Sequence, residues 1–186
     1  MTTQIGGIII AGGKSSRMGT DKGLMEYQGK LLVQYAIDLL NPLCAEIVIS
    51  TNQTEYQQFG LKTVHDVFID CGPIGGLHAA LEESHFDWNL VIACDVPFVR
   101  PELLSLLLAD KDGWDAVVPL HARGIEPLVA LYRKEMASFF ETKLYEKQYK
   151  LQRVIRDCKL NLVDADRLVH KFPDLFRNIN SVGDLI

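Results

Sequence analysis

The chain has 186 residues, of which 48% are hydrophobic and 23% are charged, which is enough for one globular domain with a substantial core. A formal net charge of −5 argues against proteins that bind nucleic acids or membrane surfaces, because both usually need a basic face. We therefore expect a single domain over residues 1–186, in which any polyanionic substrate is held by local cations or by a metal ion.

The N-terminal residues carry no pattern typical of export or membrane insertion. Residues 1–6 contain no Lys or Arg, and the apolar run at residues 8–11 is far too short for a secretory or membrane-spanning segment. The four cysteines are widely separated and form no CxxC pair, so they predict neither a zinc site nor a redox pair. We expect a cytoplasmic protein with reduced thiols, and a monomer is the simplest expectation for a chain of this size.

A glycine-rich loop follows the first predicted strand. Residues 10–23 read IAGGKSSRMGTDKG. Gly12 and Gly13 lack a Cβ, so they can adopt positive φ and let backbone N–H groups approach an anion. Arg17 and Lys22 can add positive charge. The spacing fits neither GxxxxGK[ST] nor GxGxxG, yet the pattern predicts a phosphate-binding loop.

The first half of the chain alternates apolar runs with helical patterns. Strands that are buried on both faces of a parallel sheet are expected to show such continuous apolar runs. The alternation predicts a doubly wound, three-layer α/β fold with a mostly parallel sheet and helices on both sides. The expected strands are residues 7–11, 47–50, 61–64 and 90–94, and the expected helices are residues 31–40, 54–59 and 74–83.

The second half continues this alternation. The loop at residues 120–126 contains His121 and Arg123 and is a candidate substrate-facing segment. Five cations gather further along the chain, and we expect a solvated helix face there, with contact to an anionic acceptor as the alternative. These cations are Lys143, Lys147, Lys150, Arg153 and Arg156. The expected helices are residues 102–109, 134–147 and 151–158, the strands are residues 116–119, 127–132 and 160–163, and residues 178–186 close the domain.

A carboxylate follows the strand at residues 90–94. Asp95 lies just past this buried run, and the carboxyl ends of strands line the ligand crevice of open α/β sheets. Mg²⁺ prefers oxygen ligands and neutralises nucleotide phosphates, so Asp95 is a candidate magnesium ligand. The alternative is that Asp95 only caps a turn or the following helix.

Two further carboxylates precede the GPIGG turn at residues 72–76. The glycines of this turn can approach a ribose or a base closely, and the helix that follows favours an anion at its N-terminus. A guanine edge offers N1–H and N2–H₂ donors that a carboxylate can accept. Asp66 and Asp70 are the candidates for this contact, and we favour Asp66.

The loop at residues 10–23 resembles the LAGGxSxRMGxDK signature of the molybdenum cofactor guanylyltransferases, with Ile10 in place of the usual leucine. The resemblance covers essentially the whole chain. GPIGG is similar to the family's GPLAG, and Asp95 falls on the aspartate of its CDxP motif. Residues 126–132 resemble the strand xPxxALY, and residues 177–185 resemble the ending xNxNTPxDL.

The resemblance implies a nucleotidyltransferase that transfers GMP from GTP to molybdenum-bound molybdopterin and releases pyrophosphate. It implies Mg²⁺ as the cofactor, bound by Asp95, and two partner proteins, one that delivers molybdopterin and an apoenzyme that receives the product. The catalytic residues it implies are Arg17, Lys22 and Asp95. The nucleotide-binding residues are Ile10, Ala11, Gly12, Gly13, Lys22, Ser50, Asp66 and Asp95.

Some assignments stay open at this point. Family members often carry an asparagine where this chain has Ser50, and Asn52 follows two residues later, so either residue is a candidate for the nucleotide contact. Asn178 and Asn180 are candidates for orienting the acceptor or the metal shell, or for tying down the chain end. The functional alternatives are a cytidylyl- or sugar-nucleotidyltransferase of the same fold, or a nucleotide-binding module without catalysis. AGG followed by RMGxDK favours the guanylyl branch.

Overall fold

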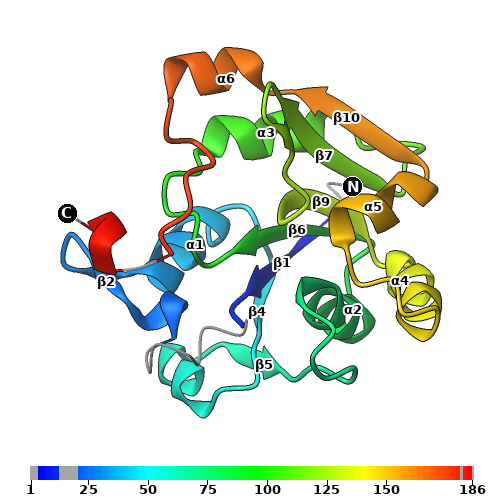
Figure 1. Cartoon of the computed structure of the whole chain (residues 1–186), viewed down its shortest axis with the longest axis horizontal. Coiled ribbons are helices and arrows are strands. Elements are labelled where there is room, and N and C mark those ends of the chain that lie inside the picture. Colours follow the sequence, from blue (N-terminus) through cyan, green and yellow to red (C-terminus); the bar gives the residue numbers. More distant parts are fainter. Residues whose placement is uncertain (1–3, 13–20, 181, 186) are drawn as a thin grey trace.

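The computed structural model describes residues 4–12, 21–180 and 182–185, and one central sheet runs through it with helices on both faces (Figure 1). The strand order is β10-β7-β9-β6-β1-β4-β5, and the short β8 pairs with β7. The strands are β1 (Ile5–Ile10), β4 (Glu46–Ser50), β5 (Lys62–Val64), β6 (Trp88–Ala93), β7 (Ala116–His121), β8 (Gly124–Ile125), β9 (Val129–Arg133) and β10 (Leu160–Asp164).

Most neighbouring strands are parallel, as the sequence predicts. β1 lies between β4 and β6 and is parallel to both, with Ile10 opposite Ser50 and Ala93. β9 is antiparallel to β6 and to β7, and β8 forms an antiparallel hairpin with β7. Because β9 is antiparallel to both of its neighbours, β7 runs in the same direction as β6, and β10 is parallel to β7. The carboxyl ends of β7 and β10 therefore lie at the same edge of the sheet as those of β1, β4 and β6.

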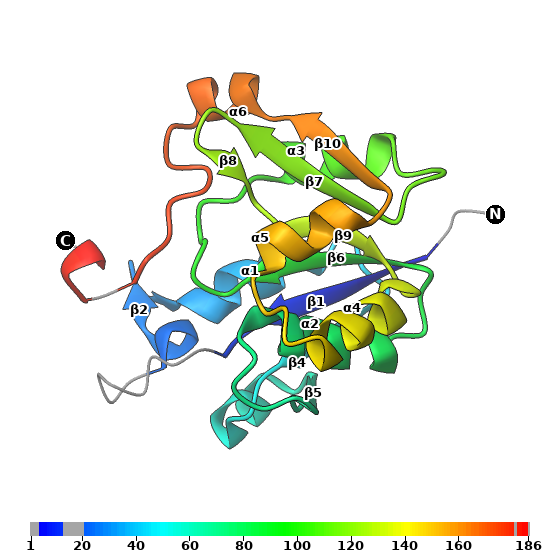
Figure 2. The ribbon, with the colours of Figure 1, turned by 45° about the vertical axis from the view of Figure 1, so that its right-hand side comes forward.

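The helices cover the two faces of the sheet in two groups (Figure 2). Ile9 of β1 packs in the core cluster that includes helices α1 and α3, whereas Ile8 and Ile10 pack in the cluster that includes α2 and α4. This division follows from the alternation of side chains along a strand. The three-layer fold expected from the sequence is therefore confirmed. The helices are α1 (Leu32–Leu40), α2 (Pro73–Glu83), α3 (Pro101–Ala109), α4 (Met136–Tyr145), α5 (Leu151–Val154) and α6 (Asp166–Lys171).

Several short elements were not expected from the sequence. β2 (Glu26–Tyr27) and β3 (Lys30–Leu31) form a hairpin whose two turn residues, Gln28 and Gly29, both have positive φ. Gln is not a usual residue at such a position, so the sequence does not predict this turn. Helix α6 has no buried residue, so it carries no apolar periodicity that could have predicted it. Within the described residues, the helix expected at residues 54–59 is the 3₁₀ helix Thr54–Phe59, and further 3₁₀ helices occur at Lys22–Leu24, Ile155–Asp157 and Val182–Leu185.

Two sequence expectations need correction. Residues 120–126 are not an open loop, because β7 continues to His121 and β8 turns back against it. The helix expected at residues 151–158 is a single α-helical turn, α5, followed by the 3₁₀ helix Ile155–Asp157. Both regions have short elements set by tertiary pairing rather than by a long apolar period.

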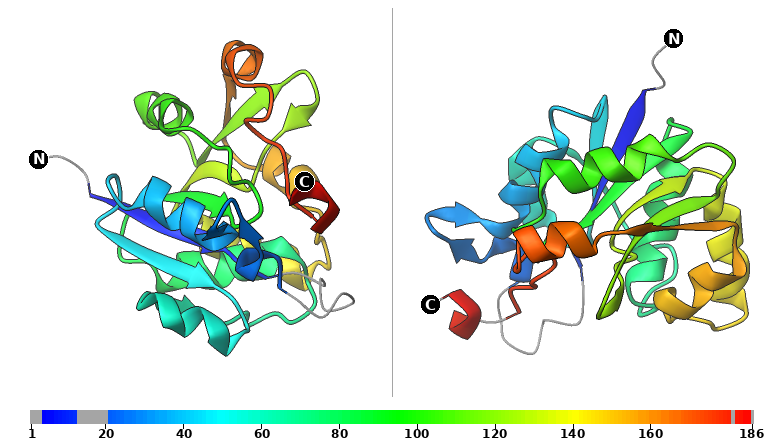
Figure 3. Two further views of the ribbon diagram at one scale, coloured as in Figure 1. Left: turned by 90° about the vertical axis from the view of Figure 1, so that its left-hand side faces the viewer. Right: turned by 90° about the horizontal axis from the view of Figure 1, so that it is seen from above.

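The C-terminal segment crosses the carboxyl edge of the sheet after α6 and ends beside the β2–β3 hairpin (Figure 3). Ile179 is fully buried and packs with Met25 and Leu32. Its backbone N–H donates to the carbonyl oxygen of Asp95 at 2.8 Å. The segment therefore brings residues 178–180 next to the end of β6. Across the described ranges, no helix is long and apolar enough to cross a membrane.

Candidate active site

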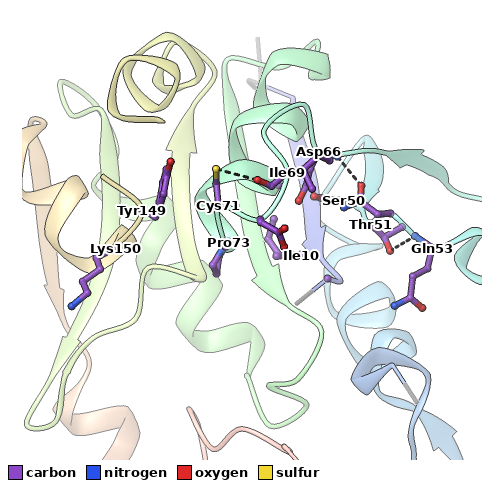
Figure 4. A pocket seen from close by; sticks show the side chains of 15 residues that line it. Ile10, Ser50, Thr51, Gln53, Asp66, Ile69, Cys71, Pro73, Tyr149 and Lys150 are labelled. Atoms are coloured by element: carbon purple, nitrogen blue, oxygen red, sulfur yellow. Dashed lines mark hydrogen bonds between the residues drawn. The ribbon is translucent and has the colours of Figure 1, made fainter. Parts of the chain in front are cut away.

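A cavity of about 440 Å³ opens at the carboxyl ends of β1 and β4 (Figure 4). One wall comes from the residues that follow β4, and another comes from the loop that leads into helix α2. Tyr149 and Lys150, from the turn between α4 and α5, stand across the cavity from Thr51 and Gln53. The cavity is lined by Ile10, Gly12, Ser50, Thr51, Asn52, Gln53, Asp66, Ile69, Asp70, Cys71, Gly72, Pro73, Gly76, Tyr149 and Lys150.

The end of β4 is held in place by its neighbours. The backbone N–H of Ala11 donates to the carbonyl oxygen of Ser50 at 2.9 Å, and that of Thr51 donates to Val64 at 2.9 Å. Ser50 is only 2% exposed, whereas the exposed Asn52 accepts the backbone N–H of Asp66 at 3.0 Å through Oδ1. Both Ser50 and Asn52 line the cavity, and Asn52 in addition fixes the backbone that carries Asp66.

Glycine at position 76 allows helix α2 to sit against two polar side chains. A Cβ at Gly76 would lie 2.5 Å from Ser50 Oγ and 3.2 Å from Asp66 Oδ1, which is closer than side chains normally pack. Gly72, which precedes the helix, has a φ of 71°, a conformation that favours glycine. The GPIGG turn is therefore a close approach between the helix and the wall that carries Asp66.

Replacing Gly76 by Ala tests this close approach. Alanine normally stabilises a helix interior relative to glycine, but the steric overlap with Ser50 Oγ is expected to dominate. We expect Gly76→Ala to lower the free energy of unfolding by about 1–3 kcal/mol. The double variant Ser50→Ala/Gly76→Ala should recover most of this loss, since the Ser50 Cβ lies at an ordinary 3.6 Å. Urea denaturation of both variants measures it, and a Gly76→Ala protein as stable as the wild type would contradict it.

The two candidate base-binding carboxylates have different environments. Asp66 is partly buried, and burial raises the pKa of its carboxyl, while the hydrogen bond with Asn52 and the charge of His65 oppose that rise. Asp70 also lines the cavity, but it is exposed and has a φ of 61°. A partly desolvated acceptor gains more from hydrogen bonds to a ligand than an exposed one. The environment therefore favours Asp66.

A second group of polar side chains lies at the end of β6. Lys22 Nζ donates to Asn180 Oδ1 at 2.6 Å and lies 3.9 Å from Asp95 Oδ2. Burial raises the pKa of the Asp95 carboxyl, and the charge of Lys22 opposes this rise. The three residues come from the start, the middle and the end of the chain, and the structure brings them together.

Asp21 holds Lys22 in position. Its carboxylate accepts the backbone N–H of Gly23 at 2.9 Å, Nε2 of Gln53 at 2.7 Å, and the hydroxyl of the buried Tyr56. Through these hydrogen bonds, Asp21 links the residues after β4 to the 3₁₀ helix that begins at Lys22. Sequence reasoning missed it, because Gln53 and Tyr56 carry no recognisable motif.

The remaining sequence candidates have different fates. Gly13 and Arg17 lie outside the described residues. Gly12 does not have a positive φ, and a Cβ there would meet nothing within 4 Å, so the expected steric need for glycine is not found at that position. Asn178 is exposed, and within the described part of the chain its side chain makes no hydrogen bond, so only Asn180 of the pair reaches Lys22. His121 is buried rather than substrate-facing.

The cationic stretch is divided between two environments. Lys143 pairs with Asp157 at 2.7 Å and with Glu146 at 3.6 Å, so it has the acidic partners expected on a helix face, but its side chain is only 15% exposed. Lys150, in contrast, lines the cavity next to Tyr149. The sequence indicates Lys150 as part of the cationic stretch, but it does not predict that Lys150 and Tyr149 line this cavity, because they lie far along the chain from every other residue of the cavity.

The fold is that of the nucleotidyltransferases. Molybdopterin-guanine dinucleotide biosynthesis protein A from Archaeoglobus fulgidus has a crystal structure that matches with a TM-score of 0.79 and 27% identity, over 97% of this chain and 94% of that one. The chain belongs to the family of MobA-like NTP transferase domains, whose profile matches residues 7–164.

Two further proteins show the difference between similarity of the family and similarity of the fold alone. A protein of Pelotomaculum thermopropionicum named "Probable molybdenum cofactor guanylyltransferase" is 34% identical over 98% of this chain and 91% of its own length. The 4-diphosphocytidyl-2C-methyl-D-erythritol synthase of Anaerococcus prevotii has a TM-score of 0.72 over 98% of this chain and 95% of that one, but only 12% identity. The likeness to the Anaerococcus protein concerns the fold alone. The family predicted from the sequence is confirmed by the matching family profile and by the Pelotomaculum protein.

Proposed function

We propose that this protein transfers GMP from GTP to molybdenum-bound molybdopterin, forming the guanine dinucleotide cofactor and releasing pyrophosphate. The observation that carries the proposal is the partly buried carboxylate of Asp66 in the wall of the 440 Å³ cavity. A carboxylate can accept both N1–H and N2–H₂ of guanine, whereas cytosine and uracil present no such pair of donors. The names of the relatives support the same donor and acceptor.

The residues at the end of β6 fit a magnesium ion. Within the residues that the structure describes, no three His, Cys, Asp or Glu side chains gather as a metal site. Mg²⁺ does not need such a cage, because it is commonly held by one or two carboxylates together with substrate phosphates and water. Asp95 would supply the carboxylate, and its side chain is 19% exposed and reachable. When bound, the ion neutralises phosphate charge.

The chain's own residues position and neutralise the phosphates. The hydrogen bond from Lys22 Nζ to Asn180 keeps the positive charge of Lys22 at the end of β6. Transfer of a nucleotidyl group needs positioning and charge stabilisation more than a covalent nucleophile. In this proposal the acceptor phosphate attacks the α-phosphorus, Lys22 stabilises the developing charge, and pyrophosphate leaves. Arg17 is assigned to the same task from the sequence.

The handover of the product requires two further proteins in this proposal, one that supplies molybdopterin and an apoenzyme that receives the finished cofactor. The cytoplasmic location and the monomeric state stay predictions from the sequence.

The direct test offers the purified protein GTP, CTP, ATP and UTP in turn, with Mg²⁺ and molybdenum-loaded molybdopterin. We expect the dinucleotide product by mass spectrometry with GTP, and at least about 100-fold less with the other nucleotides, as is typical of a site that hydrogen-bonds its substrate. Activity confined to CTP would favour the cytidylyl alternative. GTP binding without any product would favour a nucleotide-binding module without catalysis.

A further inference from the structure

The β7–β8 hairpin contains a buried histidine whose ring contacts are all defined. The side chain of His121 is 2% exposed and stacks on Phe176, with ring centroids 4.8 Å apart and planes at 19°. Nδ1 accepts the backbone N–H of Arg123 at 3.4 Å, so Nε2 carries the proton and donates to Glu126 Oε1 at 3.0 Å. The buried imidazole therefore sets the orientation of the Glu126 carboxylate.

Glu126 itself is fixed in its backbone and open in its side chain. Its N–H donates to the carbonyl oxygen of Pro119 at 3.1 Å, and its own carbonyl oxygen accepts from Val129 at 3.1 Å. A third of the side chain, 33%, is exposed. The backbone N–H of Ala93, at the end of β6, donates to the carbonyl oxygen of Leu128, two residues after Glu126, at 2.8 Å. Glu126 is thus a rigidly held, partly exposed carboxylate at the same edge of the sheet as the end of β6.

The order of the strands places Glu126 on the acceptor side. The cavity with Asp66 lies at β1, β4 and β5, Asp95 follows β6, and Glu126 lies between β8 and β9 on the far side of β6. In transfer at the α-phosphorus, the attacking and leaving oxygens lie roughly in line. With the guanine in the cavity beside Asp66, the part of this sheet edge that the cavity does not include is formed by the strands that carry Glu126, and we place the acceptor there.

The C-terminal segment connects this carboxylate to the rest of the site. Phe176 covers the ring of His121, the N–H of Ile179 binds the carbonyl oxygen of Asp95, and Asn180 binds Lys22. One short stretch of chain thus fixes the positions of three groups that come from distant parts of the sequence. A binding group keeps a productive orientation when contacts with neighbouring residues hold it in place in this way.

We propose that Glu126 binds the acceptor by accepting hydrogen bonds from the N–H groups of its pterin ring, and that His121 positions Glu126 for this contact. The proposal rests on the proposed function, which makes the acceptor a pterin. A 2-amino-4-oxo pterin presents a ring N–H and an exocyclic amino group side by side, and both donors match the oxygens of one carboxylate. Asp66 would recognise the same pattern on the guanine of the donor, at the other end of the site.

Steady-state kinetics of Glu126→Gln, with molybdenum-loaded molybdopterin and GTP varied separately, test the proposal. The change keeps the size of the side chain but replaces one acceptor oxygen by an amino group. We expect the KM for molybdopterin to rise about 10- to 100-fold. The KM and Kd for GTP should stay within about twofold of the wild type, because GTP does not contact Glu126 in this proposal. Glu141→Gln, on the exposed side of α4, is the matched control.

Two variants of His121 separate positioning from structural support. His121→Phe keeps a ring to stack on Phe176 but removes the donor to Glu126, so the KM for molybdopterin should rise as in Glu126→Gln. His121→Gln keeps an N–H donor at a similar reach, so it should recover most of the affinity. Thermal unfolding of each variant reports any loss of fold, and Glu126→Gln tests the proposal even where a His121 variant does not fold.

Several outcomes would overturn the proposal. An unchanged KM for molybdopterin in an active Glu126→Gln protein would remove Glu126 from acceptor binding while leaving the proposed function intact. Weaker binding of Mn²⁺ by electron paramagnetic resonance in Glu126→Gln, but not in Glu141→Gln, would make Glu126 a metal ligand instead. A wild-type protein that forms no product with molybdopterin and any nucleotide would overturn the proposed function, and the assignment of Glu126 with it.

Discussion

Replacing Asp95 by Asn is expected to lower kcat for guanylyl transfer by about 10³-fold, the size of effect seen when one group that stabilises transition-state charge is removed. Asn keeps the shape of the side chain but removes the charge that Lys22 faces at 3.9 Å and that Mg²⁺ would use. The Kd for GTP should rise less than about tenfold, because Asp66 and the cavity walls remain. Product formation by mass spectrometry and GTP titration by calorimetry measure the two effects.

The fold should tolerate this change. Burial raises the pKa of Asp95, which means that the surroundings disfavour its charge, so a neutral amide at this position adds no burial penalty. Asp87→Asn is the matched control, since Asp87 precedes the same strand, β6, at its opposite end and is exposed. Transfer at the wild-type rate by Asp95→Asn would remove Asp95 from the mechanism.

The second large effect is expected at Asp66. Asp66→Asn replaces one carboxylate oxygen by an amino group that repels the N–H donors of guanine. Hydrogen bonds to a charged group contribute about 1.5–3 kcal/mol, so kcat/KM for GTP should fall about 10- to 100-fold. The values for ATP and CTP, which lack the guanine donors, should change little. Competition between the nucleotides in one reaction measures this selectivity directly.

The same variant tests the effect of pH. The pKa of Asp66 is raised by burial, and only the charged form accepts both donors, so GTP affinity should fall as the pH drops toward that raised pKa. The part of the pH dependence that is due to Asp66 should be missing in Asp66→Asn, whereas the titration of GTP itself is common to both proteins. Asp70→Asn is the control, because Asp70 lines the same cavity but is exposed. Loss of GTP preference in Asp70→Asn alone would reverse the assignment of the two carboxylates.

The regular parts of the fold were predictable from local patterns. Runs such as residues 5–10 are buried on both faces, and a continuous apolar run is the direct consequence of that burial. The place of Asp95 was predictable for a related reason, since a residue that follows a buried strand must lie at the edge of the sheet. The short elements, such as the β2–β3 hairpin and α6, were missed because they bury too little apolar surface to show a period.

The sequence by itself determined the family, the sheet with its carboxyl edge, and the positions of Lys22, Asp66 and Asp95 as candidates, because these depend on residues that are neighbours along the chain. Only the tertiary structure decided which of these residues meet, and with what support. The contact of Lys22 with Asn180 and the pair of His121 with Glu126 depend on how the C-terminal segment and a hairpin return to one edge of the sheet. Contacts between residues far apart in sequence follow from the packing of the whole chain, and no local pattern records them.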